Sequence, residues 1–308
     1  MAKRTDCIVI LNQGSGKSED KPGPSEIERA FSDHGRTVSV LTVSEGDEIA
    51  ARIAEAVEAA PACIVAAGGD GTICAVAEAL KGTEIELGVI PLGTFNYFAR
   101  RFGLPDDHER AIEVICQGTA RPMALGTVNG RVFLNNASLG LYPSILKERE
   151  DVYKRWGRSR LAAYWSVLVA MATVSRPLTM HIDVDGEARS EKSPNLFVAM
   201  SAYQLDEFGI EGADAIREGK FALLLAPDCG RFMLIWKALR VAMRGVRRGP
   251  DFTLVSGRRV TVGTRRSRAL VAIDGEREAM RAPFEFEMLE NALSVRLPGE
   301  AADRGQAA

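Results

Sequence analysis

The first third of the chain alternates short apolar runs with segments of helical periodicity, and this alternation restricts the fold more than any other feature. Four strands are predicted, at Cys7–Leu11, Thr37–Val43, Ala62–Ala67 and Leu87–Ile90. Four helices are predicted between and after them, at about Ser25–His34, Asp47–Ala59, Thr72–Lys81 and Asp106–Gln117. Strands that alternate with helices in this way form a parallel sheet covered by crossover helices. Ligands of such open sheets bind beside the carboxyl ends of the strands.

Beyond residues 122–127 the pattern changes to strands joined by tight turns. Three dipeptides of the kind favoured in two-residue hairpin loops occur there, namely Asn129-Gly130, Asp185-Gly186 and Asp274-Gly275. The fold class expected is therefore α/β plus β. We expect an α/β domain over residues 1–125, a mostly antiparallel β domain over residues 126–298, and a tail at residues 299–308. The last strand of the second domain is a candidate to return to the first.

The composition is that of an ordinary globular protein. Of the 308 residues 46% are apolar and 26% are charged, and the formal net charge is −2. These values exclude a disordered, collagen-like or nucleic-acid-coating chain. The five cysteines are widely spaced, at Cys7, Cys63, Cys74, Cys116 and Cys229. Because none forms a C-x-x-C pair, we expect neither a zinc ribbon nor a disulfide framework, and we expect a reducing compartment.

Neither export nor a membrane span is expected. The apolar run near the N-terminus is too short for the core of a signal peptide. The longest apolar stretch, Leu161–Val174, has about 14 residues where roughly 20 are needed to cross hydrocarbon. This stretch is interpreted as a helix that lines a cleft or, as is more usual, packs in the core.

Two glycine-rich turns follow predicted strands of the first domain. Gly14-Ser15-Gly16-Lys17-Ser18 is similar to the end of a P-loop, but that motif requires glycine where this chain has Leu11. The turn is therefore interpreted as a polar turn whose backbone N–H groups are able to bind phosphate.

The second turn, Gly68-Gly69-Asp70-Gly71-Thr72, joins a strand to an alanine-rich helix. If the turn is a ligand site, its glycines let a phosphate approach the backbone, Thr72 is a candidate N-cap and Asp70 holds a metal ion. As plain structure, it is a tight turn with Asp70 as a local cap, and the pattern leaves both interpretations open. A third turn, Pro91–Asn96, follows the next strand and is expected to lie beside the second.

Together these motifs are similar to those of a known family. Asn12–Gly16, Gly68–Thr72 and Pro91–Arg100, in this order and spacing, resemble the diacylglycerol kinase catalytic-domain family of lipid kinases. Later blocks resemble it too, at Phe133–Gly140, Glu218–Phe221 and Ile273–Glu276. The GGDGT string alone is shared with NAD kinases and phosphofructokinases, whereas the G-T-x-N-x-x-A-R block points to lipid kinases.

The resemblance implies an N-terminal α/β nucleotide domain, a C-terminal β-sandwich that holds the lipid, and ATP with Mg²⁺ as cofactors. Carried over by position, the ATP contacts are Asn12, Gln13, Gly14, Ser15, Gly16, Thr42, Gly68, Gly69, Gly71, Thr72, Gly93, Thr94 and Asn96. It also implies that Asp70 acts at the phosphates and that Glu276 is the general base. The activity implied is transfer of the γ-phosphoryl group of ATP to a hydroxyl of a lipid such as diacylglycerol or a sphingoid base.

Several features keep alternatives open. Asp185-Gly186-Glu187 repeats the tripeptide that contains Glu276, and only the resemblance prefers Glu276. Tyr97 and Ala75 stand where the family often has carboxylates, which leaves Glu218 as the remaining candidate for an accessory metal site. A small-molecule kinase of the NAD kinase type and a non-catalytic nucleotide or lipid sensor therefore remain alternatives.

Charge is distributed unevenly along the chain. Between Arg231 and Arg268 eleven basic residues stand against Asp251 alone, a local net charge of +10. Within it, Phe232–Arg248 has the spacing of a basic amphipathic helix. Two interpretations are open: the helix docks on an anionic membrane surface, or it is a solvated helix packed on the second domain. We expect no nucleic-acid partner. The docking residues would be Arg240, Arg244, Arg247 and Arg248. We expect a cytoplasmic protein at the inner membrane face, with a homodimer as a candidate assembly.

Overall fold

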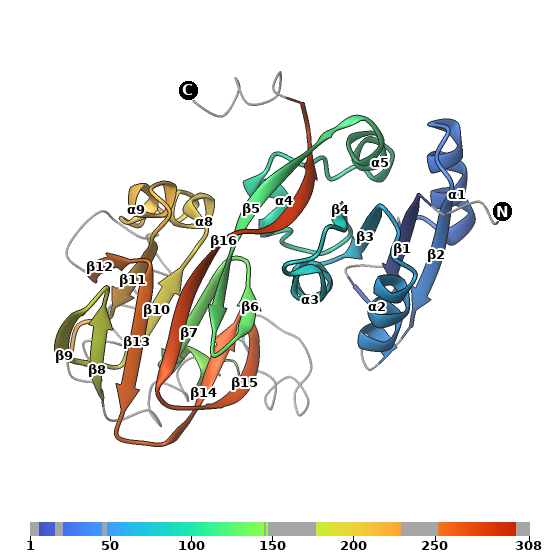
Figure 1. Cartoon of the computed structure of the whole chain (residues 1–308). Helices are drawn as coiled ribbons and strands as arrows, with labels where there is room; N and C mark the ends of the chain where they lie inside the picture. Colours follow the sequence, from blue (N-terminus) through green and yellow to red (C-terminus); the bar gives the residue numbers. More distant parts are fainter. Residues whose placement is uncertain are drawn as a thin grey trace, which may run out of the picture. The chain divides into compact units, whose positions relative to one another are not determined.

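The computed structural model of the chain describes residues 6–15, 21–44, 48–144, 146, 177–228 and 252–299 (Figure 1). The chain divides into two compact units. The first contains residues 1–125 and 289–308, and the second contains residues 126–288. The second unit thus ends before the expected residue 298, because the last strand continues into the first unit.

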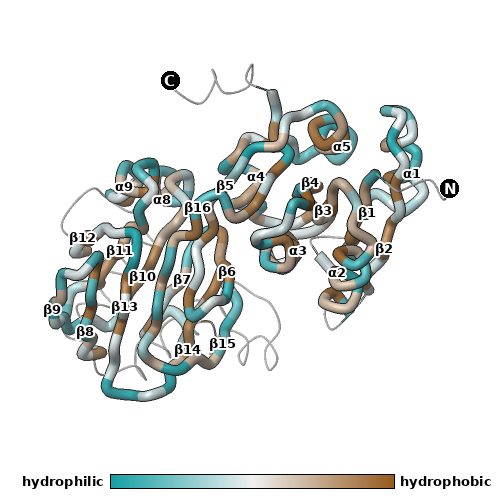
Figure 2. The backbone as a smooth tube through the Cα atoms, in the orientation of Figure 1, coloured by the Kyte–Doolittle hydropathy of each residue, from teal (hydrophilic) through white to brown (hydrophobic). Residues whose placement is uncertain are grey.

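The first unit is built on a parallel sheet with the strand order β2-β1-β3-β4. Its strands are β1 (Cys7–Asn12), β2 (Val38–Val43), β3 (Cys63–Gly68) and β4 (Glu86–Pro91). The residues of β3 are all buried, and Figure 2 shows that β1, β3 and β4 are largely hydrophobic. Strands covered by helices on both faces require such continuous apolar runs. The predicted order of strands and helices is confirmed.

Helices cover both faces of this sheet (Figure 1). They are α1 (Pro24–Asp33), α2 (Ile49–Glu58), α3 (Asp70–Leu80) and α5 (His108–Gln117). On one face, Phe31 of α1 and Ile112 of α5 pack in one cluster with Val9 and Val65. Side chains alternate along a strand, so Ile64, the neighbour of Val65, faces the other layer, where α3 contacts β3 and α2. The short helix α4 (Tyr97–Arg101) was not predicted from the sequence.

Strand β16 (Phe284–Leu297) runs through both units. Its first residues pair antiparallel with β13, and Ser294 and Val295 pair parallel with β4. Leu293, Val295 and Leu297 are buried. Burying each such side chain stabilises the fold by about 1.5–3 kcal/mol, so the end of the chain is an integral part of the first unit.

The second unit has two antiparallel layers, which include five strands joined to β16 and a separate six-stranded sheet. The first layer contains β6 (Arg131–Phe133), β8 (Leu178–Val184), β9 (Glu187–Ser193), β13 (Arg259–Thr264) and the end of β5 (Thr119–Val128), a strand that begins in the first unit. The second sheet contains β7 (Asn136–Gly140), β10 (Asn195–Ala199), β11 (Phe221–Leu225), β12 (Thr253–Gly257), β14 (Arg268–Ile273) and β15 (Glu276–Arg281). Phe133 stacks on Phe221 of the second sheet and meets Phe286 of the first edge-on. The two layers therefore share one core, which confirms the predicted fold class.

Two short helices, α8 (Ala202–Glu207) and α9 (Ala213–Arg217), pack on the six-stranded sheet. Leu205 and Ile216 cluster there with Leu224. Ser201 caps α8, because its side chain accepts a hydrogen bond from the N–H of Gln204.

The three predicted hairpin turns are confirmed. In each, both central residues have positive φ, with 48° and 83° at Asn129-Gly130, 52° and 94° at Asp185-Gly186, and 46° and 90° at Asp274-Gly275. These values are those of the type I′ turn, which Asn or Asp followed by Gly adopts most easily. The twist of this turn matches the twist of the strands that it joins.

Three cysteines that are distant in sequence pack in one buried cluster of the first unit. Cys7 and Cys63 are opposite each other on neighbouring strands, and with Cys116 they belong to one buried cluster. All three are free thiols. The hydrogen bond with Cys7, together with burial, raises the pKa of Cys63, and burial raises the pKa of Cys116 to about 11. The thiols of Cys63 and Cys116 are therefore protonated at neutral pH, whereas the same hydrogen bond lowers the pKa of Cys7.

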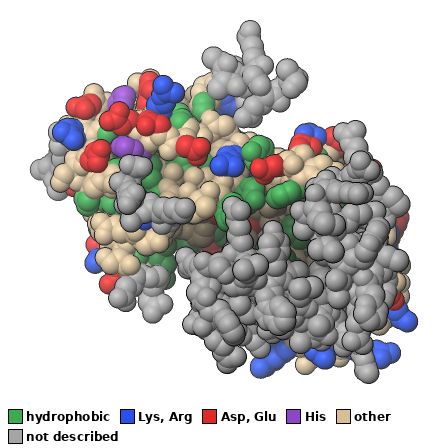
Figure 3. Space-filling view, turned by 180° about the vertical axis from the view of Figure 1, so that it is seen from behind, with side chains coloured by type: hydrophobic (Ala, Val, Ile, Leu, Met, Phe, Trp, Pro, Cys, Tyr) green, Lys and Arg blue, Asp and Glu red, His purple; other side chains and the backbone are tan. Residues whose placement is uncertain are grey.

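No helix within the described residues is long and apolar enough to span a membrane. On the face in Figure 3, acidic and basic side chains are interspersed over the described surface. The predicted basic helix at Phe232–Arg248 and the predicted apolar helix at Leu161–Val174 lie outside the described residues.

Candidate functional site

The turn after β1 is held by the side chain and backbone of Asn12. The Asn12 Oδ1 atom accepts a hydrogen bond of 2.9 Å from the N–H of Gly14, and the Asn12 carbonyl accepts one of 2.8 Å from the Ser15 hydroxyl. The same amide donates from Nδ2 to Thr72 Oγ1 at 2.9 Å. Asn12 therefore joins the first turn to the second, which lies sixty positions later in the chain.

Helix α3 begins at Asp70 with Gly69 as its N-cap, so the prediction of Thr72 as N-cap is wrong. Thr72 is buried in the first turn of the helix, where its hydroxyl accepts the bond from Asn12. Its side chain lies over Gly68, and a Cβ atom on Gly68 would come within 2.5 Å of Thr72 Oγ1. Gly68 is thus required for close packing between the end of β3 and the start of α3.

The second and third turns are in direct contact, as expected from the order of the strands. The N–H of Leu92 donates to the carbonyl of Gly68 at 2.8 Å. A Cβ atom on Gly93 would lie 2.6 Å from the Cα atom of Gly69, which is closer than real Cβ contacts. Only glycine lets the two backbones approach this closely.

Asp70 connects the second turn to the helix that follows the third. Its carboxylate accepts hydrogen bonds of 3.2 and 3.0 Å from the N–H groups of Tyr97 and Phe98, the first residues of α4. A negative charge at a helix N-terminus is favourable because the first N–H groups have no partner within the helix. Asp70 is therefore a cap, but it caps a neighbouring helix rather than a turn of its own.

Asn96 shapes the third turn. It is 6% exposed and has a φ of 51°, a left-handed conformation that asparagine tolerates better than most residues. Its Oδ1 atom accepts a bond of 2.9 Å from the N–H of Gly93. This bond fixes the loop that carries Thr94, whose side chain is exposed.

The remaining predicted ATP contacts border the same turns. Gln13, Gly14 and Gly71 are exposed, whereas Thr42 of β2 is half-buried opposite Leu11 of β1. Gly16 lies outside the described residues. The first unit thus brings the predicted turns together and leaves several of their polar groups open to solvent.

Sequence reasoning missed an aromatic pair on the third turn. Phe95 is 59% exposed and stacks on Tyr97, with ring centroids 5.7 Å apart and planes within 4° of parallel. Tyr97 occupies the position where the resemblance predicts a carboxylate. The only sequence signal for the pair was the spacing of two aromatic residues around Asn96.

The hairpin that contains Glu276 is anchored in the second unit through Asp274. The Asp274 carboxylate accepts bonds of 2.6, 2.9 and 2.9 Å from the N–H groups of Leu134, Asn135 and Asn136. Asn136 in turn donates to Gln204 in a buried bond of 2.9 Å. Glu276 is exposed at the first position of β15, directly after this fixed turn.

The second DGE string has the same turn but different surroundings. Asp185 accepts from the N–H groups of Arg258 and Arg259, and Glu187 lies 3.9 Å from the guanidinium of Arg189. No described cation lies within ion-pair distance of Glu276. In both strings the aspartate is structural, and the two glutamates differ in that a described arginine lies within ion-pair distance of Glu187 only.

The structure gives no support for Glu218 as a metal ligand. Its side chain is 65% exposed and forms an ion pair of 2.9 Å with Lys220. Within the described residues, no three His, Cys, Asp or Glu side chains are grouped so that they could hold a metal ion.

Comparisons with known proteins agree on one family. Residues 6–128 match the family model of the diacylglycerol kinase catalytic domain. The chain is 28% identical to "Diacylglycerol kinase" of Bacillus subtilis (strain 168) over 301 residues, which cover 96% of this chain and 97% of that protein. It is 35% identical over 159 residues to "Probable lipid kinase YegS-like" of Cronobacter sakazakii, and that alignment spans 50% of this chain and 52% of the relative.

A solved structure gives the same result for the fold. The crystal structure of a diacylglycerol kinase from Bacillus anthracis str. Sterne superposes with a TM-score of 0.71 at 19% identity. The superposition covers 98% of this chain and 100% of that one. The sequence matches support a lipid kinase, and the structural match shows that the fold is of the diacylglycerol kinase type.

Proposed function

We propose, from the match of residues 6–128 to the diacylglycerol kinase catalytic domain, that this protein is an ATP-dependent lipid kinase. It transfers the γ-phosphoryl group of ATP to a hydroxyl of a lipid such as diacylglycerol or a sphingoid base. In the structure, the observation that most supports the proposal is the close approach of the turns at Gly69 and Gly93.

These turns are suited to bind phosphate groups. Backbone N–H groups at a glycine turn and at the N-terminus of a helix such as α3 favour anions. Gly71 lies in the first turn of that helix, and Gln13 and Gly14 lie on the turn that Asn12 joins to it; all three are exposed. Thr94 adds an exposed hydroxyl from the third turn. Asn12 and Asp70 hold the turns in position through the hydrogen bonds described above.

Phosphoryl transfer requires positioning, charge neutralisation and a group that takes the proton of the acceptor hydroxyl. In the proposed reaction the hydroxyl oxygen forms a bond to the γ-phosphorus while the bond to the ADP oxygen breaks. Glu276 accepts the proton, because it is a carboxylate without a described ion-pair partner on a rigid turn.

A magnesium ion would arrive with the ATP phosphates and neutralise their charge during transfer. Asp70 is the negatively charged residue of the second turn, which is the proposed phosphate-binding turn. Its oxygens accept two backbone bonds, but an ionised carboxylate has about four acceptor positions, so it retains capacity for an ion.

The lipid acceptor places the working enzyme at a membrane. We therefore propose that the protein is cytoplasmic and associates peripherally with the inner membrane face, using a basic surface. The predicted docking residues Arg240, Arg244, Arg247 and Arg248 lie outside the described residues. Their role rests on the amphipathic spacing of the sequence alone.

The test is a transfer assay with radiolabelled ATP and three acceptors. Diacylglycerol, sphingosine and NAD are each incubated with the protein, and labelled products are separated by chromatography. We expect label in a lipid product and none in NADP. Label in NADP would favour a small-molecule kinase, and ATP binding without any labelled product would favour a nucleotide sensor.

A further inference from the structure

The backbone N–H groups of the first turn, at Gln13, Gly14 and Ser15, are all paired within the protein. The N–H of Gln13 donates to the carbonyl of Val43 at 3.0 Å, and that of Gly14 donates to Asn12 Oδ1 at 2.9 Å. The N–H of Ser15 donates to the Asn12 carbonyl at 3.4 Å. These three groups are therefore not available to a phosphate in this arrangement.

The first turn nevertheless lies at the proposed phosphate site. A Cβ atom on Gly69 would be 3.9 Å from the Cβ atom of Ser15 and 3.3 Å from the Cα atom of Gly93. The three turns thus meet at Gly69, which is the N-cap of α3. Phosphates bound at the start of this helix place several negative charges beside the first turn. Phosphoryl transfer requires that such charges are neutralised, so a side chain has to make the contact from this turn.

Lys21 brings a positively charged side chain to the first turn. Its Nζ atom donates a hydrogen bond of 2.6 Å to the carbonyl of Gln13. An ammonium group has three N–H donors, so this bond leaves two of them for a further acceptor. No described carboxylate lies within ion-pair distance of Lys21, whereas Lys220 of the second unit pairs with Glu218 at 2.9 Å. The charge of Lys21 is therefore not neutralised by any of the described residues.

The segment that follows Lys21 fixes the position of its backbone. Pro22 is buried, Gly23 is the N-cap of α1 and Pro24 is the first residue of that helix. A proline fixes its own φ and restricts the residue before it to extended conformations. The N–H of Gly23 also donates to the Glu26 carboxylate at 3.4 Å. Binding of a ligand by Lys21 therefore has to order its side chain but not its backbone, which lowers the entropic cost.

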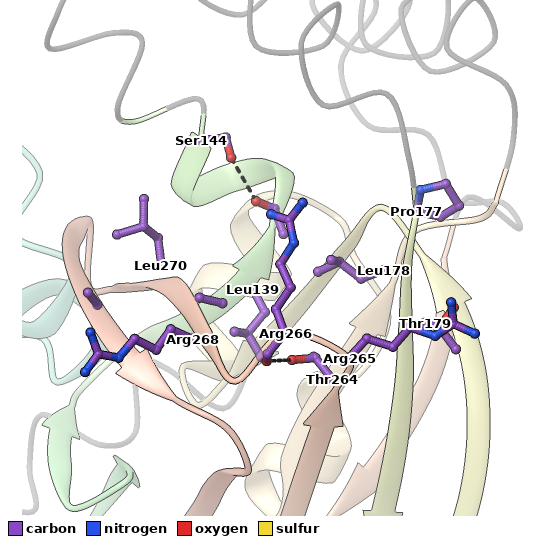
Figure 4. Close-up of a pocket in the computed structure, with 13 residues that line it drawn as sticks. Leu139, Ser144, Pro177, Leu178, Thr179, Thr264, Arg265, Arg266, Arg268 and Leu270 are labelled. Atoms are coloured by element: carbon purple, nitrogen blue, oxygen red, sulfur yellow. Dashed lines mark hydrogen bonds between the residues drawn. The ribbon is translucent and has the colours of Figure 1, made fainter.

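Basic side chains also line a cavity of about 760 Å³ in the second unit, at the turn between β13 and β14 (Figure 4). They are Arg265, Arg266 and Arg268. The family resemblance places the lipid acceptor in this unit, and none of the residues that line the cavity belongs to the three turns of the nucleotide site. Lys21 differs from these arginines, because its contact is with one of those turns inside the first unit.

We propose that Lys21 is a binding residue for the phosphate groups of ATP. This inference rests on the proposed function, since it requires ATP at the three turns. The bond to Gln13 keeps the ammonium group at the first turn before ATP binds, and its remaining N–H groups donate to phosphate oxygens in the complex. Lysine binds phosphate as a point charge, so the contact depends on charge more than on a fixed geometry. Through Lys21 the first turn supplies the positive contact that its paired backbone does not.

The test measures binding of ATP and of adenosine by titration calorimetry, with magnesium present and no lipid. Lys21→Gln removes the charge but keeps a hydrogen-bond donor for the Gln13 carbonyl, and Lys21→Arg keeps the charge. The matched control is Lys81→Gln, which removes the same charge within the first unit. Lys81 follows the C-terminus of α3, so the 11 residues of that helix, about 16 Å in length, separate it from Gly69.

We expect Lys21→Gln to bind ATP on the order of thirtyfold more weakly than the parent, because a charge-assisted hydrogen bond to phosphate is lost. Its affinity for adenosine should stay within about twofold of the parent value, since adenosine carries no phosphate. Lys21→Arg should bind ATP within about threefold of the parent because the charge is kept. Lys81→Gln should do the same because solvent and salt screen a charge at that distance, to within about threefold.

Three results would overturn this role and leave the proposed function intact. The first is equal ATP affinity in Lys21→Gln and the parent. The second is a parallel loss of ATP and adenosine binding in Lys21→Gln, which would show that Lys21 only shapes the turn. The third is an equal loss of ATP binding in Lys21→Gln and Lys21→Arg, which would show that its charge is not what binds. A parent protein that binds no ATP would contradict the proposed function itself, and this role with it.

Discussion

For Asp70 the sequence allows two interpretations, a structural cap and a residue of a ligand site, and one side chain is able to fill both roles. Its carboxylate stabilises the start of α4 through Tyr97 and Phe98, which is a structural role. The same two bonds hold the third turn against the second, and this arrangement is the candidate phosphate site. The observed structural role and the proposed role at the phosphates would therefore depend on the same atoms.

This double role gives a prediction for Asp70→Asn. The amide keeps one acceptor oxygen but presents an N–H₂ group to the second backbone N–H. We expect the free energy of unfolding in urea to fall by about 1–3 kcal/mol, because bonds to a charged acceptor are lost. Lipid phosphorylation should fall by about a hundredfold or more.

The matched control is Asp107→Asn. Asp107 caps α5 by accepting a single bond of 2.9 Å from the N–H of Arg110, and asparagine is an equally good N-cap. We expect its unfolding free energy to stay within about 0.5 kcal/mol of the parent value. If Asp70→Asn were as stable as this control, the bonds to α4 would make no measurable contribution to the free energy of unfolding.

At the scale of elements, the site consists of turns whose backbones touch. Glycine at Gly69 and Gly93 sets the distance between the second and third turns, and Asn12 sets the distance between the first and second. The strands beneath are mostly apolar, apart from Asn12 at the end of β1 and Glu86 at the start of β4, so the polar groups of the site lie at the ends of β1, β3 and β4 and just after them.

Gly93→Ala tests this contact. The new methyl group would lie 2.6 Å from Gly69 Cα and 2.7 Å from Asn96 Oδ1, so the turns must separate. Overpacking of this kind costs about 1–3 kcal/mol, and we expect ATP affinity to fall about tenfold or more. Gly263→Ala is the control, because its methyl group would make only ordinary contacts of 3.7 Å. Parent-like ATP affinity in Gly93→Ala would show that the contact does not shape the nucleotide site.

Elements with strong periodicity could be predicted from the sequence, and elements that depend on distant partners could not. The buried strands β1 and β3 and the type I′ hairpins follow from local patterns. Helix α4 is five residues long and has its cap in Asp70, far from it in sequence. The N-cap at Thr72 was wrongly predicted for the same reason, since Asn12 engages its hydroxyl from another strand.

At the scale of the molecule, the last strand, β16, joins the two units because it pairs with strands of each of them. β16 pairs with β13 at Phe284–Glu287 and with β4 at Ser294 and Val295. From the sequence, the last strand is a candidate to return to the first domain, but neither its bounds nor its partners could be predicted, because pairing across the chain leaves no local signal. Likewise, the residues suggest Glu276 and Glu187 equally, and only the resemblance to the family prefers Glu276.

The most direct test of the lipid kinase assignment compares Glu276→Gln with Glu187→Gln in single-turnover transfer from ATP to the preferred lipid. Both glutamates are exposed after type I′ turns, so the two substitutions are matched in cost to the fold. We predict that Glu276→Gln lowers the rate of transfer by about a hundredfold or more with little change in ATP binding, and that Glu187→Gln stays within about twofold of the parent. Equal rates in the two variants would contradict Glu276 as the general base.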